Sequence, residues 1–545
     1  MAQAISAQFK FGFHPWATLH RGVQIQTDGS ACSSMAVASV ALHGRVVASQ
    51  ETRTPQLAHH RPARLPVVHM MVASWVGTTK PSVPRCAIAH GAVAAAVCIG
   101  RQCRSRTAQR RGRPVVASVA AASSGDGEVF LGIDFGTSGC RIACLNMQGS
   151  LVAEASVRYR AGASLDAWRI ALREVLKAVP QRGSAAAVCI DGTSATALLC
   201  DAEGLPVAGP LMYNHACSSP ALEKCRAAVP SPSHVAASPT STLSKVMEWL
   251  HSGCVPRGAQ LAHQADWLAS LLHGESLVTD YHNALKLGYD TEALCWPDWL
   301  LEDGQVAALL PKRVAVPGET IGTVTAAASA WSGLPERCRV VAGTTDSIAA
   351  FLAAGTTGVG EAVTSLGSTL AVKLRSQRRV EDAASGVYSH RLGPGQWLVG
   401  GASNSGGAVL RQLFSDEALA RLSAEIDPEA PSGLDYYPLP AAGERFPVAD
   451  AALPPRLEPR PPEEARFLHG VLEGIARIEA RGYGRLQELG AGAVTRVATA
   501  GGGARNATWR RIRERLLGVP VVAAEWAQAA CGAALLARNG PSLLG

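Results

Sequence analysis

The sequence predicts an α/β protein of layered architecture with two similarly built domains, and three observations indicate this. Residues 129–146 read as two apolar strands joined by a short turn of Gly, Thr and Ser. An amphipathic helix and another apolar strand come next, which is typical of α/β layers. Residues 361–374 repeat the hairpin, and aligning Gly136 with Gly367 brings one small polar turn onto the other. With 545 residues, the chain is long enough for two or three domains.

The elements of the first half are expected in the order strand, strand, strand, helix and strand, at 129–134, 141–146, 151–160, 164–180 and 185–191. The helix is amphipathic because apolar residues recur at helical spacing, namely Leu165, Trp168, Leu172, Val175, Leu176 and Val179. Ser164 is its expected N-cap. Helical patterns return at 241–253 and 263–274.

The second half is expected to end in alternating helices and strands after the hairpin at 361–374. The Pro-rich segment 453–467 reads as a connector before a long helix over 463–490. A strand at 494–500, a helix containing Trp509, a strand at 519–524 and a small-residue helix at 527–540 complete the pattern.

The first 125 residues differ from the rest in charge. They contain 14 Lys and Arg but only two acidic residues, whereas the remainder has 37 basic and 41 acidic side chains. The Ala, Ser, Val and Arg-rich composition of 1–125 is that of an organelle transit peptide, so no fold is expected there. We expect a plastid as the destination, with the mitochondrion as the alternative. A disordered extension or a mis-assigned start codon is the other interpretation of this segment.

Charge and hydropathy exclude several function classes. The slightly acidic remainder offers no basic surface for nucleic acid. The apolar runs in the leader are shorter than the roughly 20 residues that cross a bilayer, so no membrane span is expected. Ten cysteines follow residue 126 without a C-x-x-C pair, which indicates buried reduced thiols rather than a zinc site or a disulfide framework.

The turn of the first hairpin suits a phosphate group. Backbone N–H groups around Thr137 and Ser138, with two hydroxyls, can converge on one anion. Asp134 ends the first strand, where a carboxylate can hold Mg²⁺ beside that phosphate. The same residue types also close ordinary hairpins, and the second Gly-Ser-Thr turn is what favours phosphate binding.

Two further segments have candidate chemistry. Gly-rich residues 498–506 follow an apolar strand and open a helix, so a nucleotide can approach their backbone, with Asn506 and Trp509 nearby. A structural helix start with Trp509 in the core fits the spacing equally well. Asp346 lies where a buried strand becomes an Ala-rich helix, and it can cap that helix, accept the proton of an attacking alcohol, or both.

Taken together, the motifs D-F-G-T-S-G, D-G-T-S, G-T-T-D-S, L-G-S-T and A-G-G-G-A-R-N, in this order over roughly residues 128–540, resemble the FGGY carbohydrate kinases of the actin-like ATPase superfamily. The segments LGIDFGTSGCRI, KLGYD, AGTTDSIAAF and GGGARNATWRRI are most similar to the D-ribulose kinase, or xylulose kinase-like, branch of plastids and photosynthetic bacteria. The resemblance implies two actin-like (ribonuclease H-like) domains flanking a cleft. Residues 126–353, completed by 527–545, would form the sugar and phosphate domain, and 354–526 the adenosine-binding domain.

The resemblance also implies ATP and Mg²⁺ as cofactors and gives roles by motif match. Asp346 would be the catalytic base, with Asp134 and Thr137 at the phosphate and Asp134 at the metal. The sugar would contact Asp134, Ser194 and Asp346. ATP would be held by Thr137, Ser138, Gly367, Ser368, Thr369, Gly502, Gly503, Asn506 and Trp509.

The resemblance implies phosphorylation of a free ketopentose, D-ribulose to D-ribulose 5-phosphate, by a monomer or homodimer whose partners are the sugar and ATP. Many relatives carry W-N-D-x-R on a sugar-facing loop, whereas this chain has Y-N-H-A-C at 213–217. This departure leaves xylulose or another polyol open as the acceptor. An actin-like ATPase switch and a degenerate sugar-binding protein are the alternatives of another class, although Ser365 stands in the second hairpin where such switches usually carry an acid.

Overall fold

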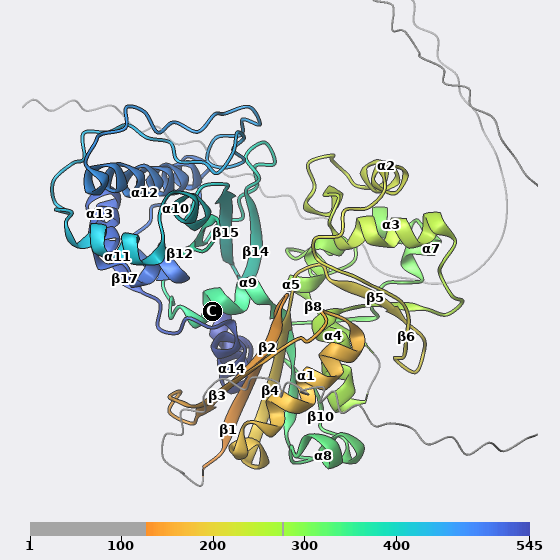
Figure 1. Ribbon diagram of the computed structural model, residues 1–545. Coiled ribbons are helices and arrows are strands. Elements are labelled where there is room, and N and C mark those ends of the chain that lie inside the picture. The colour runs from red at the N-terminus through yellow and green to blue at the C-terminus, as the bar shows by residue number, and fades with distance from the viewer. Residues whose placement is uncertain (1–126, 275–276) are drawn as a thin grey trace, which may run out of the picture. The chain divides into compact units, whose positions relative to one another are not determined.

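The computed structural model describes residues 127–274 and 277–545, so the predicted transit peptide at 1–125 lies outside the described residues. Two six-stranded sheets form the framework (Figure 1). Nearly every residue of β1 (Val129–Phe135) and β4 (Ala185–Gly192) is buried, because helices cover both faces of the sheet that contains them.

The first sheet has the order β10-β11-β4-β1-β2-β3. Strand β1 pairs antiparallel with β2 (Gly139–Asn146), which pairs with β3 (Leu151–Arg158), while β1 and β4 run parallel. Strand β11 (Arg339–Thr345) runs parallel to β4, and β10 (Thr320–Thr323) lies at the edge.

The second sheet repeats these pairings in the order β14-β15-β13-β12-β16-β17. Strand β12 pairs antiparallel with β13 and parallel with β16, as β1 does with β2 and β4. The strand bounds are β12 (Glu361–Leu366), β13 (Leu370–Ser376), β14 (Tyr388–Gly393), β15 (Gln396–Ser403), β16 (Arg496–Ala500) and β17 (Val521–Ala523). The prediction of two similarly built α/β domains is confirmed.

The helices expected from periodicity are present. They are α1 (Leu165–Lys177), α3 (Thr242–Ser252), α4 (Gln264–His273), α12 (Glu464–Glu488), α13 (Ala507–Leu517) and α14 (Ala529–Asn539). The Ser164 hydroxyl accepts a hydrogen bond from the backbone N–H of Ala167, so Ser164 caps α1 as predicted. Trp168 and Leu172 of that helix are buried in the first core.

Several elements were not expected from the sequence. A three-stranded sheet combines β5 (Ala197–Cys200), β6 (Pro206–Leu211) and β7 (Gln260–His263), and β8 (Val278–Asp280) pairs with β9 (Arg313–Ala315). Further short helices are α2 (Ser219–Ala228), α5 (Tyr281–Ala284), α6 (Asp298–Leu301), α7 (Gly304–Ala307), α8 (Ala326–Ser332), α10 (Gly407–Leu413) and α11 (Asp416–Ala424), whereas α9 (Asp346–Ala353) is the predicted Ala-rich helix. These strands and helices are too short for a clear periodic signal.

Helix α14 packs directly against β1, β2, β4 and α9 (Figure 1). A Cβ at Gly132 of β1 would overlap backbone atoms of Ala530 and Ala534. A Cβ at Gly532 would overlap the carbonyl oxygen of Ala349 in α9. Backbone therefore meets backbone on both sides of α14, which only glycine allows at positions 132 and 532.

The ten cysteines of the described residues are all free thiols, and eight of them are buried, whereas Cys254 and Cys295 are exposed. Within 127–274 and 277–545, no helix combines the length and the hydrophobicity needed to cross a bilayer.

Gly532→Ala is expected to lower the free energy of unfolding by about 1–3 kcal/mol, because the added methyl group must push α14 away from α9. Urea unfolding followed by circular dichroism measures the change. Gly484→Ala is the matched control within α12, since a Cβ there would meet nothing within 4 Å. It is expected to stabilise by about 0.5–1 kcal/mol. Equal changes in the two variants would contradict the close packing of α14.

Candidate functional site

The first turn exposes its two hydroxyl side chains. Gly136 N–H donates to the Gly139 carbonyl at 3.0 Å, which closes the turn. Tyr159 holds it from behind, because its hydroxyl donates to Gly136 O at 3.2 Å and its N–H donates to Ser138 O at 3.1 Å. Thr137 and Ser138 remain exposed. The loop thus presents hydroxyls and backbone N–H groups outward, which suits an oxyanion.

Two carboxylates lie side by side at the end of the first sheet. Asp134 of β1 and Asp191 of β4 are register partners on neighbouring parallel strands. Arg141 donates to Asp134 at 3.2 Å, whereas neither oxygen of the fully buried Asp191 accepts a hydrogen bond from the described residues. Burial, and then the charge of Asp134, raises the pKa of Asp191 well above its usual range. Burial also raises the pKa of Asp134, and Arg141 opposes that shift.

The same two carboxylates fit a divalent cation. A buried carboxylate without donors is costly unless a positive charge or a proton neutralises it. In the part of the chain that the structure describes, no group of three or more His, Cys, Asp or Glu side chains could hold a metal ion. Mg²⁺ here would therefore rely on one or two carboxylates, with phosphate oxygens and water supplying the rest, which is its usual coordination.

Asp346 is the first residue of α9, directly after β11. Its Oδ1 accepts the N–H of Ser347 at 2.7 Å, and Thr345 occupies the N-cap position, so Asp346 is not the N-cap itself. Burial, and then the charge of Asp134, raises the pKa of Asp346 to about 6. A half-buried carboxylate with this pKa is ionised at neutral pH and can accept a proton.

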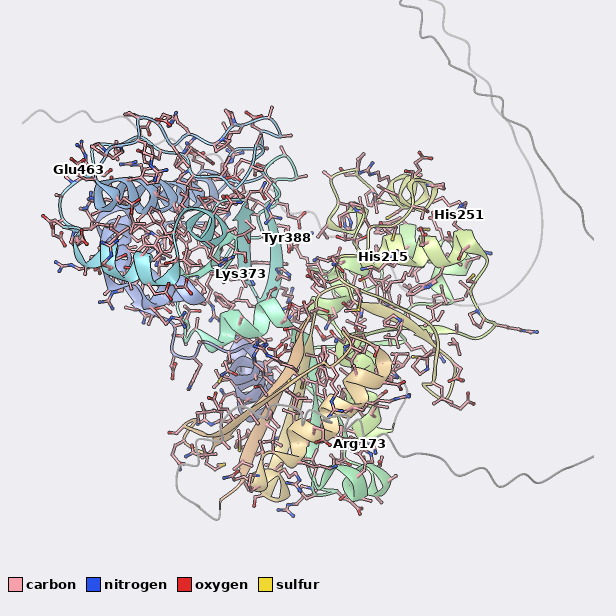
Figure 2. The ribbon with its side chains drawn as sticks, viewed as in Figure 1. Arg173, His215, His251, Lys373, Tyr388 and Glu463 are labelled. Atoms are coloured by element: carbon pink, nitrogen blue, oxygen red, sulfur yellow. The ribbon has the colours of Figure 1, made fainter. Side chains whose placement is uncertain are left out.

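Lys373 of β13 reaches the same helix start. Its ammonium donates to the carbonyl of Ser347, and burial lowers the pKa of Lys373 to about 8. Figure 2 labels Lys373 on β13 and Tyr388 on β14. Both residues line a hollow of about 380 Å³, together with Ser347, His390 and Arg445. This hollow lies beside Asp346 because Ser347 belongs to its wall.

Ser194 lies in the turn after β4, three positions beyond Asp191. The turn is strained, since Ala195 has a φ of 63°, in the left-handed region. The buried ammonium of Lys245 donates to Ala195 O at 2.6 Å and so stabilises that backbone. Ser194 is half-buried at the same end of the sheet as Asp191.

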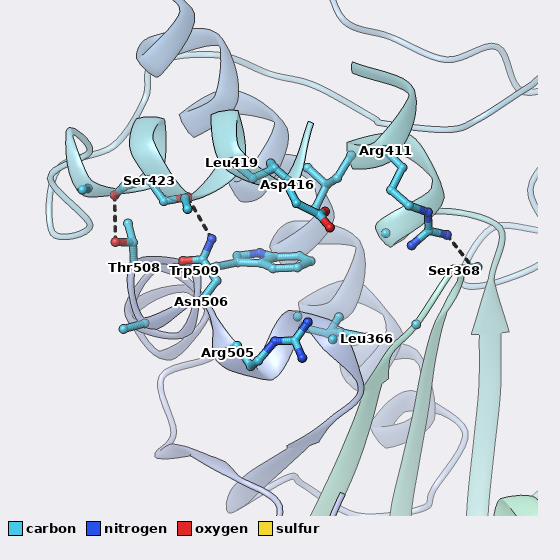
Figure 3. Close-up of a pocket in the computed structure, with 18 residues that line it drawn as sticks. Leu366, Ser368, Arg411, Asp416, Leu419, Ser423, Arg505, Asn506, Thr508 and Trp509 are labelled. Atoms are coloured by element: carbon cyan, nitrogen blue, oxygen red, sulfur yellow. Dashed lines mark hydrogen bonds between the residues drawn. The ribbon is translucent and has the colours of Figure 1, made fainter. Parts of the chain in front are cut away.

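The two predicted nucleotide segments of the second sheet wall one cavity of about 810 Å³ (Figure 3). Its lining includes Gly367, Ser368, Gly502, Gly503, Asn506 and Trp509. Thr369 is exposed in the same turn but does not line the cavity. The volume lies within the roughly 300–1,000 Å³ range of small-molecule sites.

The three glycines after β16 differ in what they require. Gly501 has a φ of 88°, and a Cβ at Gly503 would lie 2.7 Å from the Cβ of Leu366. These two positions therefore need glycine for the fold itself. A Cβ at Gly502 would meet nothing within 4 Å, so this glycine leaves open space in the cavity.

Asn506 and Trp509 line the cavity and also stabilise the surrounding fold (Figure 3). Asn506 caps α13, because its Oδ1 accepts the N–H of Trp509 at 2.9 Å, and its Nδ2 donates to Ser423 at 2.8 Å. Trp509 is only 2% exposed, and its indole N–H donates to Leu472 O at 3.1 Å. The spacing was compatible with Trp509 in the core or at a bound nucleotide. In the structure, Trp509 belongs to the core, and part of its ring forms the wall of the cavity.

Sequence reasoning missed Asp191 and Lys373 as site residues. Asp191 was visible in the D-G-T-S motif, and a signal existed, since its strand repeats the pattern of an apolar run ending in Asp. Lys373 has no local signal, because its place beside Ser347 depends on contact between distant segments.

Comparison with known proteins shows what this arrangement resembles. Residues 362–538 match the C-terminal domain of the FGGY family of carbohydrate kinases. The gluconokinase of Bacillus licheniformis is 23% identical over 286 residues, covering 48% of this chain and 55% of the relative. The xylulose kinase of Bacillus subtilis is 27% identical over 232 residues, covering 41% and 46%. The chain thus spans about half the length of these relatives.

A solved xylulose kinase from Brucella ovis superposes with a TM-score of 0.66 at 23% identity, covering 76% of this chain and 90% of that one. The chain therefore shares the two-domain α/β fold of this solved sugar kinase.

Asp346→Asn is expected to raise the free energy of unfolding at pH 7.5 by on the order of 1–2 kcal/mol. The raised pKa of Asp346 means that the folded state binds the proton more tightly than the unfolded state. The ionised carboxylate therefore costs stability above about pH 6, and the cost disappears as the pH falls toward 4. Urea unfolding at both pH values measures the gain, which is expected only at pH 7.5. Exposed Asp166 provides the control substitution, and a loss of stability at pH 7.5 would contradict the electrostatic argument.

Proposed function

We propose that this protein is an ATP-dependent carbohydrate kinase that phosphorylates a free ketopentose, D-ribulose, at its terminal 5-hydroxyl. The observation that carries the proposal is that Asp134 and Asp346 lie at the same end of the first sheet. Asp134 of β1 is the register partner of Asp191 on β4. Asp191 also pairs with Thr344 of β11, two residues before Asp346. A base candidate and a candidate phosphate turn lie there together, as transfer of a phosphoryl group to an alcohol requires.

In this proposal the residues divide the work. Asp346 accepts the proton of the acceptor hydroxyl, while Thr137 and Ser138 hold phosphate oxygens at the first turn. Gly367 and Ser368 present the second turn, and the cavity beside Gly502 takes the adenosine. Asp134 would hold Mg²⁺, which would supply positive charge for the phosphates. Most of the rate acceleration then comes from positioning and charge stabilisation.

The acceptor is proposed from resemblance and from the hollow beside Asp346. Its lining offers Lys373, Tyr388, His390 and Arg445 as hydrogen-bonding groups within reach of a bound polyol. The Y-N-H-A-C loop at 213–217 supports an acceptor different from that of relatives with W-N-D-x-R. Xylulose and gluconate, the substrates named for relatives, are the rival acceptors. We also propose that residues 1–125 direct the protein to the plastid stroma.

The proposal is tested by coupled ADP release from the full chain with D-ribulose, D-xylulose, gluconate and glycerol as acceptors. D-ribulose is expected to stimulate ADP release above the rate without sugar. Asp346→Ala is expected to lower kcat by about 10²–10⁴-fold, because the general base is lost. Asp166→Ala is the matched control. Equal ADP release with every acceptor would favour an ATPase switch, and stimulation by another sugar alone would replace D-ribulose as the substrate.

Gly502→Val is expected to weaken ATP binding at least about tenfold, or about 1.4 kcal/mol, because its side chain would fill part of the cavity. The melting temperature should not change, since no atom lies within 4 Å of the new Cβ position. Gly304→Val, equally unobstructed but outside the cavity, is the control. Isothermal titration calorimetry measures the dissociation constants. Unaltered ATP binding in Gly502→Val would place the adenosine elsewhere.

A further inference from the structure

Helix α10 is docked onto the second Gly-Ser-Thr turn. The N–H groups of Gly407 and Ala408 donate to the carbonyls of Gly367 and Ser368, both at 2.9 Å. These two bonds turn the carbonyl side of the turn toward the helix and leave its other side facing the cavity.

A pair of glycines makes this docking possible. Gly406 has a φ of 139°, and a Cβ there would lie 2.7 Å from the carbonyl carbon of Thr369. A Cβ at Gly407 would lie 2.5 Å from the carbonyl oxygen of Gly367. The helix therefore approaches the turn more closely than residues with side chains would permit.

Arg411 lies one helical turn after Gly407, on the same face of α10. Its Nη2 donates to the hydroxyl of Ser368 at 2.8 Å, and the side chain lines the 810 Å³ cavity (Figure 3). No residue in the described ranges forms an ion pair with Arg411, whereas Arg421 on the neighbouring helix α11 pairs with Glu425 at 3.1 Å. Most of the five N–H groups of the Arg411 guanidinium thus remain available at the turn.

The position of Arg411 within the cavity indicates which part of a nucleotide it meets. Ser368 and Arg411 lie at one end, while Ser423, Asn506 and Thr508 lie at the other (Figure 3). At the far end, the Asn506 amide donates to the Ser423 hydroxyl and the Thr508 hydroxyl donates to the Ser423 carbonyl. These groups and Trp509 suit an uncharged base and ribose. Asp416 and Arg505 also line the cavity, and Arg411 is the charged residue that is hydrogen-bonded to the turn. A cation beside a polar turn suits phosphate oxygens.

We propose that Arg411 is a phosphate-binding residue of this kinase, and that it contacts the nucleotide beyond the α-phosphate. The inference rests on the proposed function, since it specifies how the same cavity recognises ATP. Arg411 also orients the Ser368 hydroxyl, so the turn and the guanidinium act on the same phosphates.

The test measures the dissociation constants of adenosine, AMP, ADP and ATP, with Mg²⁺ present and no acceptor, by isothermal titration calorimetry on the full chain. Arg411→Ala is expected to weaken ADP and ATP about 10-fold to 100-fold, as expected for loss of a charge-assisted hydrogen bond, and to leave adenosine and AMP within about twofold. Arg411→Lys should recover part of the loss, because it keeps the charge but not the planar fork. Arg421→Ala removes the same charge nearby without touching the cavity, and it should bind all four ligands like the wild type.

Three results would overturn the inference. Equal losses for adenosine and ATP in Arg411→Ala would show that the side chain only maintains the cavity. Unchanged ATP binding in the same variant, with a wild type that binds ATP, overturns the role of Arg411 and leaves the kinase proposal standing. A wild type that binds none of the four ligands overturns both together. Melting temperatures of all variants confirm that each one is folded.

Discussion

The candidate site depends on the direct backbone contact of α14 with β1 on one side and α9 on the other. Gly132 and Gly532 make this approach possible, because any larger side chain would overlap the facing backbone. Asp134 follows Gly132 by two residues, and Asp346 begins the helix that carries Ala349. The helix thus holds the two carboxylates at a fixed separation, through contacts that have no side-chain rotamers to adjust. Small residues outside the site, Gly132 and Gly532, therefore help to hold its carboxylates in position.

In the second sheet, a buried ion pair supports the strands that lead to the cavity. Arg513 and Glu479 form a fully buried bidentate pair, with bonds of 2.6 and 2.7 Å. Arg513 also donates to Thr499 at 2.7 Å, just before the glycine run that follows β16, and the hydroxyl of Thr364 on β12 donates to Glu479. A buried pair of this kind adds little net stability but is costly to break. It therefore fixes the two strands whose ends present the turn and the triple glycine.

Local patterns were enough for the framework but not for everything in the site. Both hairpins, the capped helix α1 and the glycine segment follow from apolar runs, turn residues and helical spacing, which act within a few positions. Asp191 could not be assigned to the site from sequence, because its position beside Asp134 depends on the parallel register of β1 and β4. Arg411 could not be assigned either, because it reaches the turn only where the glycine pair Gly406 and Gly407 lets α10 pack closely. Sequence spacing alone could not assign Trp509, because a core tryptophan and a ligand-facing tryptophan occur at the same spacing. The burial of the side chain in the structure distinguishes the two. The roles of Asp134 and Asp346 stay predictions until measured.

Because α14 covers the sheet that contains β1, a ribosome must translate nearly the whole described chain before the first sheet can reach its native packing. The face of β1 that contains Gly132 would stay uncovered while the second sheet is synthesised. Chaperones that bind nascent apolar segments would have this long interval in which to act. Premature termination shortly before residue 529 would then damage the first half of the protein, although every codon for that half had been read. The segment after α14 is held to the second sheet as well, since Arg375 of β13 donates to Leu544 O at 2.7 Å.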